Sequence, residues 1–162
     1  MTSARRPARS FPKPDPIAEA VRYLARGDRS AAQVQRHLAG LGFPGAAIRR
    51  ALRTLQRLGY VDDEAVALRM AEARLARRPM AREALAAELE ARGFSAGAVA
   101  RAVQHAYAGL SEEAVAQRFL KSLLRRFSDP AREGRRRASL LRGRGFSTDV
   151  SESVLGVTAN DS

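Results

Sequence analysis

Hydrophobic residues recur along most of the chain at the spacing of an amphipathic α-helix. Ile17, Val21 and Leu24 stand four and three residues apart, which places them on one face of a helix with 3.6 residues per turn. The same spacing returns, with short interruptions, as far as Leu155. No stretch shows sustained alternation of apolar and polar residues, so strands are not expected. The pattern predicts an all-α protein.

Capping residues divide this pattern into nine predicted helices. Ser30 with Gln33 has the form of a capping box, and Ser95, Ser111 and Ser147 stand where a helix N-cap is expected. Glycines close most of the segments. The predicted helices cover roughly 15–26, 30–41, 44–58, 63–76, 80–92, 95–108, 111–127, 129–144 and 147–155.

An internal repeat groups the helices in threes. Gly-Phe occurs at 42–43, 93–94 and 145–146, so the phenylalanines stand 51 and 52 residues apart. Each Phe is preceded by a leucine five residues earlier and followed by an apolar residue nine residues later. We therefore predict three tandem three-helix, helix-turn-helix-like repeats that stack into an elongated, curved solenoid and cover each other's cores.

The expected organisation is an array of repeats between two tails. The third repeat has Arg137 and Ser151 where the other two have apolar residues, so we expect it to be the least stable. The predicted parts are a disordered basic arm at 1–14, repeats at 15–60, 61–109 and 110–156, and a flexible tail at 157–162.

The segment between the first and second repeats carries the clearest helix-stop and helix-start signals. Gly59 suits the position just past a helix C-terminus, and Asp62 and Asp63 can cap the next helix. Tyr60 and Val61 lie between these signals, so we expect both to be buried, with Tyr60 as the anchor between repeats.

Charge is the strongest compositional feature. The 29 Lys and Arg residues exceed the 17 Asp and Glu residues by 12, which favours a polyanionic partner. The chain has no cysteine, no apolar run long enough to span a membrane and no secretory signal, which fits the cytoplasm. His37 and His105 are 68 residues apart and no metal-ligand spacing or nucleophile motif occurs, so neither a cofactor nor catalysis is expected.

The positive charge is concentrated near the end of the chain. Residues 118–144 contain ten basic residues and two acids, a net charge of +8, which favours docking on a polyanion or an acidic groove over a merely solvated face. The helices that start near 44 and 95 begin with small neutral residues, so sequence-specific reading of DNA bases is not expected. The ten basic residues are Arg118, Lys121, Arg125, Arg126, Arg132, Arg135, Arg136, Arg137, Arg142 and Arg144.

Through the segment Leu58-Gly59-Tyr60-Val61-Asp62-Asp63, the chain resembles the RecX family of recombinase regulators, and the resemblance covers about residues 15–156. Support comes from segment 74–79, from Glu88-Leu89 and from the later Gly-Phe pairs. Val66 departs from the family, which usually has an aromatic there.

The resemblance implies a non-enzymatic protein that binds RecA, lodges in the helical groove of its filament on DNA, and inhibits ATP hydrolysis and strand exchange. We expect a monomer that binds through the basic residues of the third repeat, with non-specific contacts to single- and double-stranded DNA. The alternative is a general nucleic-acid-binding helical protein that has no recombinase partner.

Overall fold

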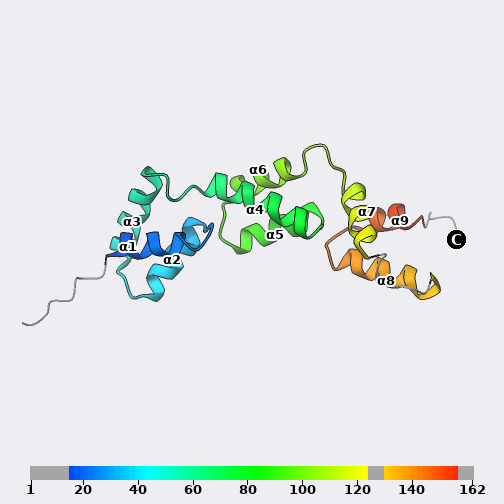
Figure 1. The fold of residues 1–162 in the computed structure, drawn as a ribbon, viewed down its shortest axis with the longest axis horizontal. Helices are drawn as coiled ribbons and strands as arrows, with labels where there is room; N and C mark the ends of the chain where they lie inside the picture. The colour runs from blue at the N-terminus through cyan, green and yellow to red at the C-terminus, as the bar shows by residue number, and fades with distance from the viewer. Residues whose placement is uncertain (1–14, 124–129, 157–162) are drawn as a thin grey trace, which may run out of the picture.

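The computed structural model describes residues 15–123 and 130–156, and within these ranges the chain forms nine α-helices and no strand (Figure 1). The helices follow one another in groups of three along the long axis of the molecule. The predicted all-α fold of tandem three-helix repeats is therefore confirmed, whereas the predicted repeat boundaries stay a prediction. The helices are α1 (Pro16–Leu24), α2 (Ala31–Gly40), α3 (Gly45–Arg57), α4 (Asp63–Arg77), α5 (Arg82–Ala91), α6 (Ala96–Ala106), α7 (Glu112–Leu123), α8 (Pro130–Arg142) and α9 (Thr148–Leu155).

The predicted caps begin the helices as expected. Ser30 accepts a hydrogen bond from Gln33 N, and the Gln33 side chain accepts one in return from Ser30 N, which completes the capping box of α2. Ser95, Ser111 and Ser147 each accept a bond from the backbone N–H three residues later, at the starts of α6, α7 and α9. The helix starts thus follow from local side-chain chemistry.

The repeated leucine of the sequence pattern is a core position in every repeat. Leu38, Leu89 and Leu141 are all buried. The first core lies among α1, α2 and α3 and forms a cluster of its own. Among the described residues, the second core runs without a break from α4 to α9, so repeats two and three share one apolar core that is separate from the core of the first repeat.

The aromatic anchor of the second core is Tyr107. Its side chain is 1% exposed, and its hydroxyl donates a hydrogen bond to the carbonyl of Met80. The guanidinium of Arg82 lies over the ring, 4.2 Å from its centroid. Burial, with the nearby Glu112 carboxylate, raises the pKa of Tyr107 to about 12, so the hydroxyl stays a hydrogen-bond donor.

The prediction that Tyr60 is buried is wrong. Tyr60 is 57% exposed and Leu58 is 58% exposed, whereas Val61 is 4% exposed and packs in the first core. The chain reverses at Gly59, where φ is +76°, and Tyr60 N bonds back to Leu55 O at 2.9 Å. The backbone after Gly59 directs the Val61 side chain into the first core and leaves the Tyr60 side chain mostly in solvent.

Ser151 stands where the other two repeats have an apolar residue, and its hydroxyl finds a hydrogen-bond partner within α9. Ser151 is buried, and its hydroxyl donates to the carbonyl of Ser147 at 2.8 Å, one helical turn earlier. The buried oxygen therefore has a partner, which removes the main cost of placing serine in an apolar position. Arg137, the other substitution, is half-buried.

Replacing Tyr107 with Ala will lower the free energy of unfolding by about 3–5 kcal/mol, because a large buried side chain leaves a cavity. The matched change Tyr60→Ala will cost about 0.5 kcal/mol or less, because the ring lies mostly in solvent. Urea unfolding followed by circular dichroism measures both. A larger loss for Tyr60→Ala would contradict the assignment of the two rings.

Candidate protein and nucleic-acid interface

Two of the hydrogen bonds that join the second repeat to α2 lie at the start of this helix. The hydroxyl of Ser30 donates to the carbonyl of Arg92 at 2.6 Å, at the turn between α5 and α6. The backbone N–H of Ala31 donates to Asp63 Oδ1 at 2.7 Å. The second aspartate of the signature segment thus binds the preceding repeat, at the positive end of the α2 dipole.

The third repeat docks on the start of α5 in the same way, with different atoms. The backbone N–H of Ala81, the counterpart of Ser30, donates to the carbonyl of Arg144 at 2.9 Å. The backbone N–H of Arg82 donates to Glu112 Oε1 at 2.8 Å. Both joints therefore pair an elbow carbonyl and an acidic side chain with the first turn of a helix in the preceding repeat.

Close approach of the preceding repeat explains the glycine of the second and third Gly-Phe pairs. A Cβ on Gly93 would lie 2.5 Å from Ala32 Cβ, and one on Gly145 would lie 2.8 Å from Ala84 Cβ. At Gly42, in the first repeat, no described atom lies within 4 Å of the same position. The phenylalanines differ in the same way: Phe94 and Phe146 are buried, whereas Phe43 is only half-buried.

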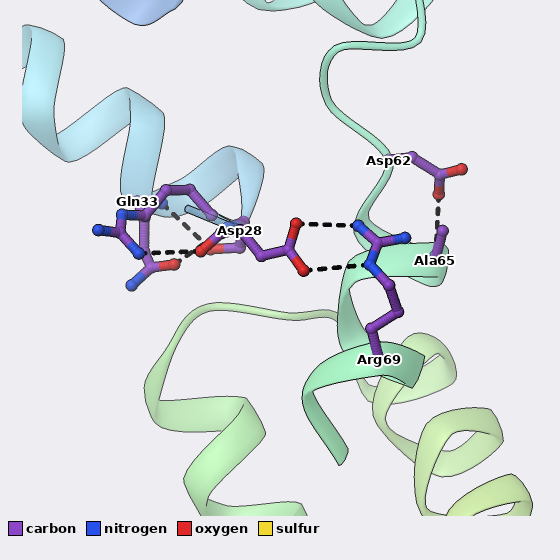
Figure 2. Close-up of polar contacts among 7 residues, drawn as sticks. Asp28, Gln33, Asp62, Ala65 and Arg69 are labelled. Carbon is purple, nitrogen blue, oxygen red and sulfur yellow. Dashed lines mark hydrogen bonds and ion pairs between the residues drawn. The ribbon is translucent and has the colours of Figure 1, made fainter. Parts of the chain in front are cut away.

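An ion pair crosses the first joint. The guanidinium of Arg69 on α4 donates to both carboxylate oxygens of Asp28, at 3.1 and 2.9 Å (Figure 2). This contact lowers the pKa of Asp28. Asp62 caps α4 nearby by accepting from Ala65 N at 3.0 Å. Both partners of the pair are about half exposed, so the pair adds orientation more than stability.

Two of the predicted binding arginines hold the second joint together. Arg118 donates to the carbonyl of Leu75 at 2.8 Å. Arg144 donates to the carbonyl of Pro79 at 3.2 Å, and its guanidinium lies 4.5 Å from the centroid of the Phe119 ring. Burial is the main cause that lowers the pKa of Arg144, and the positive charges of Arg78 and Arg74 lower it further. These cations connect the third repeat to the second.

The other predicted residues have different environments. Lys121, Arg135, Arg136 and Arg142 are exposed, and Arg137 is half-buried. Arg125 and Arg126 lie outside the described residues, and of Arg132 the structure describes only the backbone, in α8. We call Arg135, Arg136 and Arg142 the α8 basic face.

A second basic surface was missed in the sequence. The exposed residues Arg49, Arg50, Arg53 and Arg57 lie along α3. A shallow hollow of about 290 Å³ is lined by Arg50, Arg53, Thr54 and Arg57. The signal was present, because residues 29–61 contain six arginines and no acid.

The two histidines lie in different surroundings. The ring of His37 stacks on that of Tyr23 with centroids 4.1 Å apart, and His105 lies 3.1 Å from a carboxylate oxygen of Glu72. Nowhere in the described ranges do three His, Asp or Glu side chains gather as a metal site requires. Across the same ranges, no helix has the length and apolar character needed to cross a membrane.

The fold and surface define a tandem helical-repeat protein whose exposed chemistry is mainly cationic. Comparison with known proteins identifies the family that has this architecture. Residues 17–55 match the model of the RecX first three-helix domain. Regulatory protein RecX of Mycobacterium ulcerans is 33% identical over 154 residues, covering 92% of this chain and 88% of the relative, and that of Mycobacterium avium is 30% identical over the same length.

Solved structures agree at the level of fold. The crystal structure of RecX from Lactobacillus salivarius superimposes with a TM-score of 0.73 at 18% identity, over 87% of this chain and 92% of that one. Another crystal structure of regulatory protein RecX gives a TM-score of 0.68 at 19% identity, over 86% of this chain and 71% of that one. The chain belongs to the RecX family of regulatory proteins.

Replacing Gly93 with Ala will destabilise the protein more than the matched change Gly42→Ala. Both glycines have positive φ, so each change will cost about 1–2 kcal/mol in backbone strain. At Gly93 the new methyl also meets Ala32, which will add about 1–3 kcal/mol through overpacking. Thermal and urea unfolding of both variants measures the difference. Equal losses would show that the first joint is not tightly packed.

Acid will weaken the ion pairs that join neighbouring elements. Contact with Arg69 lowers the pKa of Asp28, and contact with Arg74 lowers that of Glu88. A carboxyl whose pKa is lower in the folded chain stabilises the fold above its unfolded pKa, and this contribution is lost as the pH falls through the folded value. Because these groups are substantially exposed, each will contribute at most about 1 kcal/mol.

The test compares urea unfolding from about pH 6 to about pH 3 for the wild type and for Asp28→Asn combined with Glu88→Gln. The wild type will lose more stability over this interval, because the variant lacks both titrating groups. If the free energy of unfolding falls equally with pH in the wild type and the variant, neither ion pair contributes to stability.

Proposed function

We propose that this protein regulates a RecA-type recombinase by binding its nucleoprotein filament on DNA, in the helical groove, and that it lowers ATP hydrolysis and strand exchange. The observation that carries the proposal is the α8 basic face, presented at one end of a long repeat array in a chain of the RecX family. The protein acts as a monomer in the cytoplasm, without a cofactor or catalysis of its own.

The shape and charge of the molecule support this proposal. A row of helices offers an extended surface, which suits a long groove better than a compact pocket (Figure 1). Arg135 and Arg142 stand seven residues apart on α8, two helical turns, so their side chains share a face. Guanidinium groups pair bidentately with carboxylates and phosphates, both of which a filament on DNA presents.

The structure refines which predicted residues we propose for binding. Lys121, Arg135, Arg136 and Arg142 have exposed side chains, and Arg125, Arg126, Arg132 and Arg137 remain in the proposed set from the sequence. Arg118 and Arg144 donate to carbonyls of the second repeat. We therefore assign these two a positioning role, in which they orient the third repeat.

The protein will reduce single-stranded-DNA-dependent ATP hydrolysis by the recombinase when the two are present at comparable concentrations. Replacing Arg135 and Arg136 with Glu will weaken this effect at least tenfold, because two attractive charges become repulsive. Arg137 is left unchanged, because its side chain is half-buried and a carboxylate there could disturb folding. A coupled assay of ADP release during titration measures the effect.

The matched control is Arg26→Glu combined with Arg77→Glu, which reverses two exposed charges in the first and second repeats. It will inhibit like the wild type, and circular dichroism will verify that both variants are helical. Equal inhibition by the α8 variant and the control would remove the α8 basic face from the binding surface. Unchanged hydrolysis with the wild type would refute the proposed inhibition.

A second candidate function is general nucleic-acid binding without a recombinase partner. The exposed arginines of α3 favour it, because they provide a cationic surface remote in sequence from α8. Pull-down of the recombinase without DNA, set beside a mobility shift of DNA without recombinase, separates the candidates. Binding only to DNA would favour the second.

A further inference from the structure

The outer face of α3 has the form of a binding site. Arg50, Arg53 and Arg57 are spaced i, i+3 and i+7, so they lie in a row on one side of the helix. Ile48, Ala51 and Leu55 are the buried residues of the same helix. The hollow of about 290 Å³ lies between the arginines, and Thr54 contributes to its lining. The fold thus gives this row a fixed position and a concave surface.

The charge of this row is not balanced within the described chain. The ion pairs seen between described residues include Arg69, Arg74 and Arg101, each with a carboxylate, but none includes Arg50, Arg53 or Arg57. No acid occurs anywhere from residue 29 to residue 61. An external anion is therefore the natural partner of these guanidinium groups, and a phosphate backbone supplies anions in a row.

An exposed aromatic side chain lies at the C-terminal end of the row. Tyr60 is 57% exposed and follows Arg57 by three residues, with the exposed Leu58 between them. An aromatic ring beside a cationic groove is the combination that proteins use to bind single strands, since bases stack on the ring while phosphates contact the cations. Duplex DNA keeps its bases stacked and paired, and so leaves such a ring without a partner.

We propose that the first repeat carries a binding site for single-stranded nucleic acid, in which Arg50, Arg53 and Arg57 contact the phosphates and Tyr60 stacks on a base. This α3 site lies in a different repeat from the α8 basic face. It needs no recombinase, so it goes beyond the regulatory function proposed above. The proposal also assigns a role to the Tyr60 ring, which is exposed and does not pack in the core.

The test measures fluorescence anisotropy of a labelled oligo-dT strand titrated with the full chain, without recombinase. Replacing Arg50, Arg53 and Arg57 together with Ala will weaken binding at least tenfold. It will also reduce the slope of log affinity against log salt by about 2, since each phosphate contact in a single strand contributes about 0.7. The matched control is Arg22→Ala, Arg26→Ala and Arg101→Ala, which removes three exposed charges elsewhere and will retain most of the affinity.

A second pair of variants isolates the stacking contact. Tyr60→Ala will weaken binding of oligo-dT about tenfold without changing the salt slope, and Tyr60→Phe will restore it, because the ring rather than the hydroxyl stacks. An abasic strand of equal length will bind the wild type and Tyr60→Ala alike. These readouts would not move if Tyr60 had a merely structural role.

Three results would overturn the proposal. The first is equal affinity of the α3 triple variant and its control, and the second is equal binding of single strand and duplex by the wild type. The third is displacement of oligo-dT by poly-glutamate at equal charge, with Tyr60→Ala behaving as the wild type, which would assign the row to an acidic protein surface. Loss of ATPase inhibition in the α8 variants, with oligo-dT binding retained, would separate the two surfaces.

Discussion

The arrangement of the repeats depends on a hydrogen bond between an elbow carbonyl and the first turn of a helix in the preceding repeat. At the first joint the carbonyl of Arg92 accepts from the Ser30 hydroxyl, and at the second the carbonyl of Arg144 accepts from the Ala81 backbone. The bond brings the residue after the carbonyl, Gly93 or Gly145, so close to an alanine of the preceding repeat that a Cβ on it would lie 2.5 or 2.8 Å from the alanine Cβ. Glycine at the elbow is therefore a requirement of stacking as well as of the turn.

The two joints share this geometry but differ in what surrounds it. Around the second joint the apolar core is continuous from α4 to α9, and Arg118 and Arg144 bind carbonyls of the second repeat. Around the first joint the cores are separate, and the contacts include the exposed pair of Asp28 with Arg69. Since exposed ion pairs are screened by salt whereas apolar burial is not, the first joint is the more sensitive to solution conditions.

Arginine serves two purposes in this chain, and local geometry decides between them. Arg144 is half-buried against the ring of Phe119 and donates to the carbonyl of Pro79, so its charge is used within the fold. Arg50, Arg53 and Arg57 are exposed on α3, and no ion pair between described residues includes them. The net charge of +12 is thus divided between packing and surfaces that can meet a polyanion.

Much of the fold could be read from the sequence by itself, because its determinants are local. Ser30 caps α2 through a residue only three positions away, and Gly59 ends α3 through its own backbone conformation. The 51- and 52-residue spacing of Gly-Phe revealed the repeats, and Leu38, Leu89 and Leu141 are buried as that register requires. The resemblance carried by residues 58–63 identified the RecX family, which the relatives then confirmed.

The tertiary structure alone decided which side chains face solvent and which cations bind within the fold. Tyr60 and Val61 are both apolar and adjacent, and only the direction of the chain after Gly59 places one outside and the other in the core. Arg118 meets Leu75 across 43 residues of sequence, and Arg144 meets Pro79 across 65. Helix starts and ends depend on neighbours within about four residues, whereas exposure depends on contacts between distant segments, which a pattern of residue types does not specify.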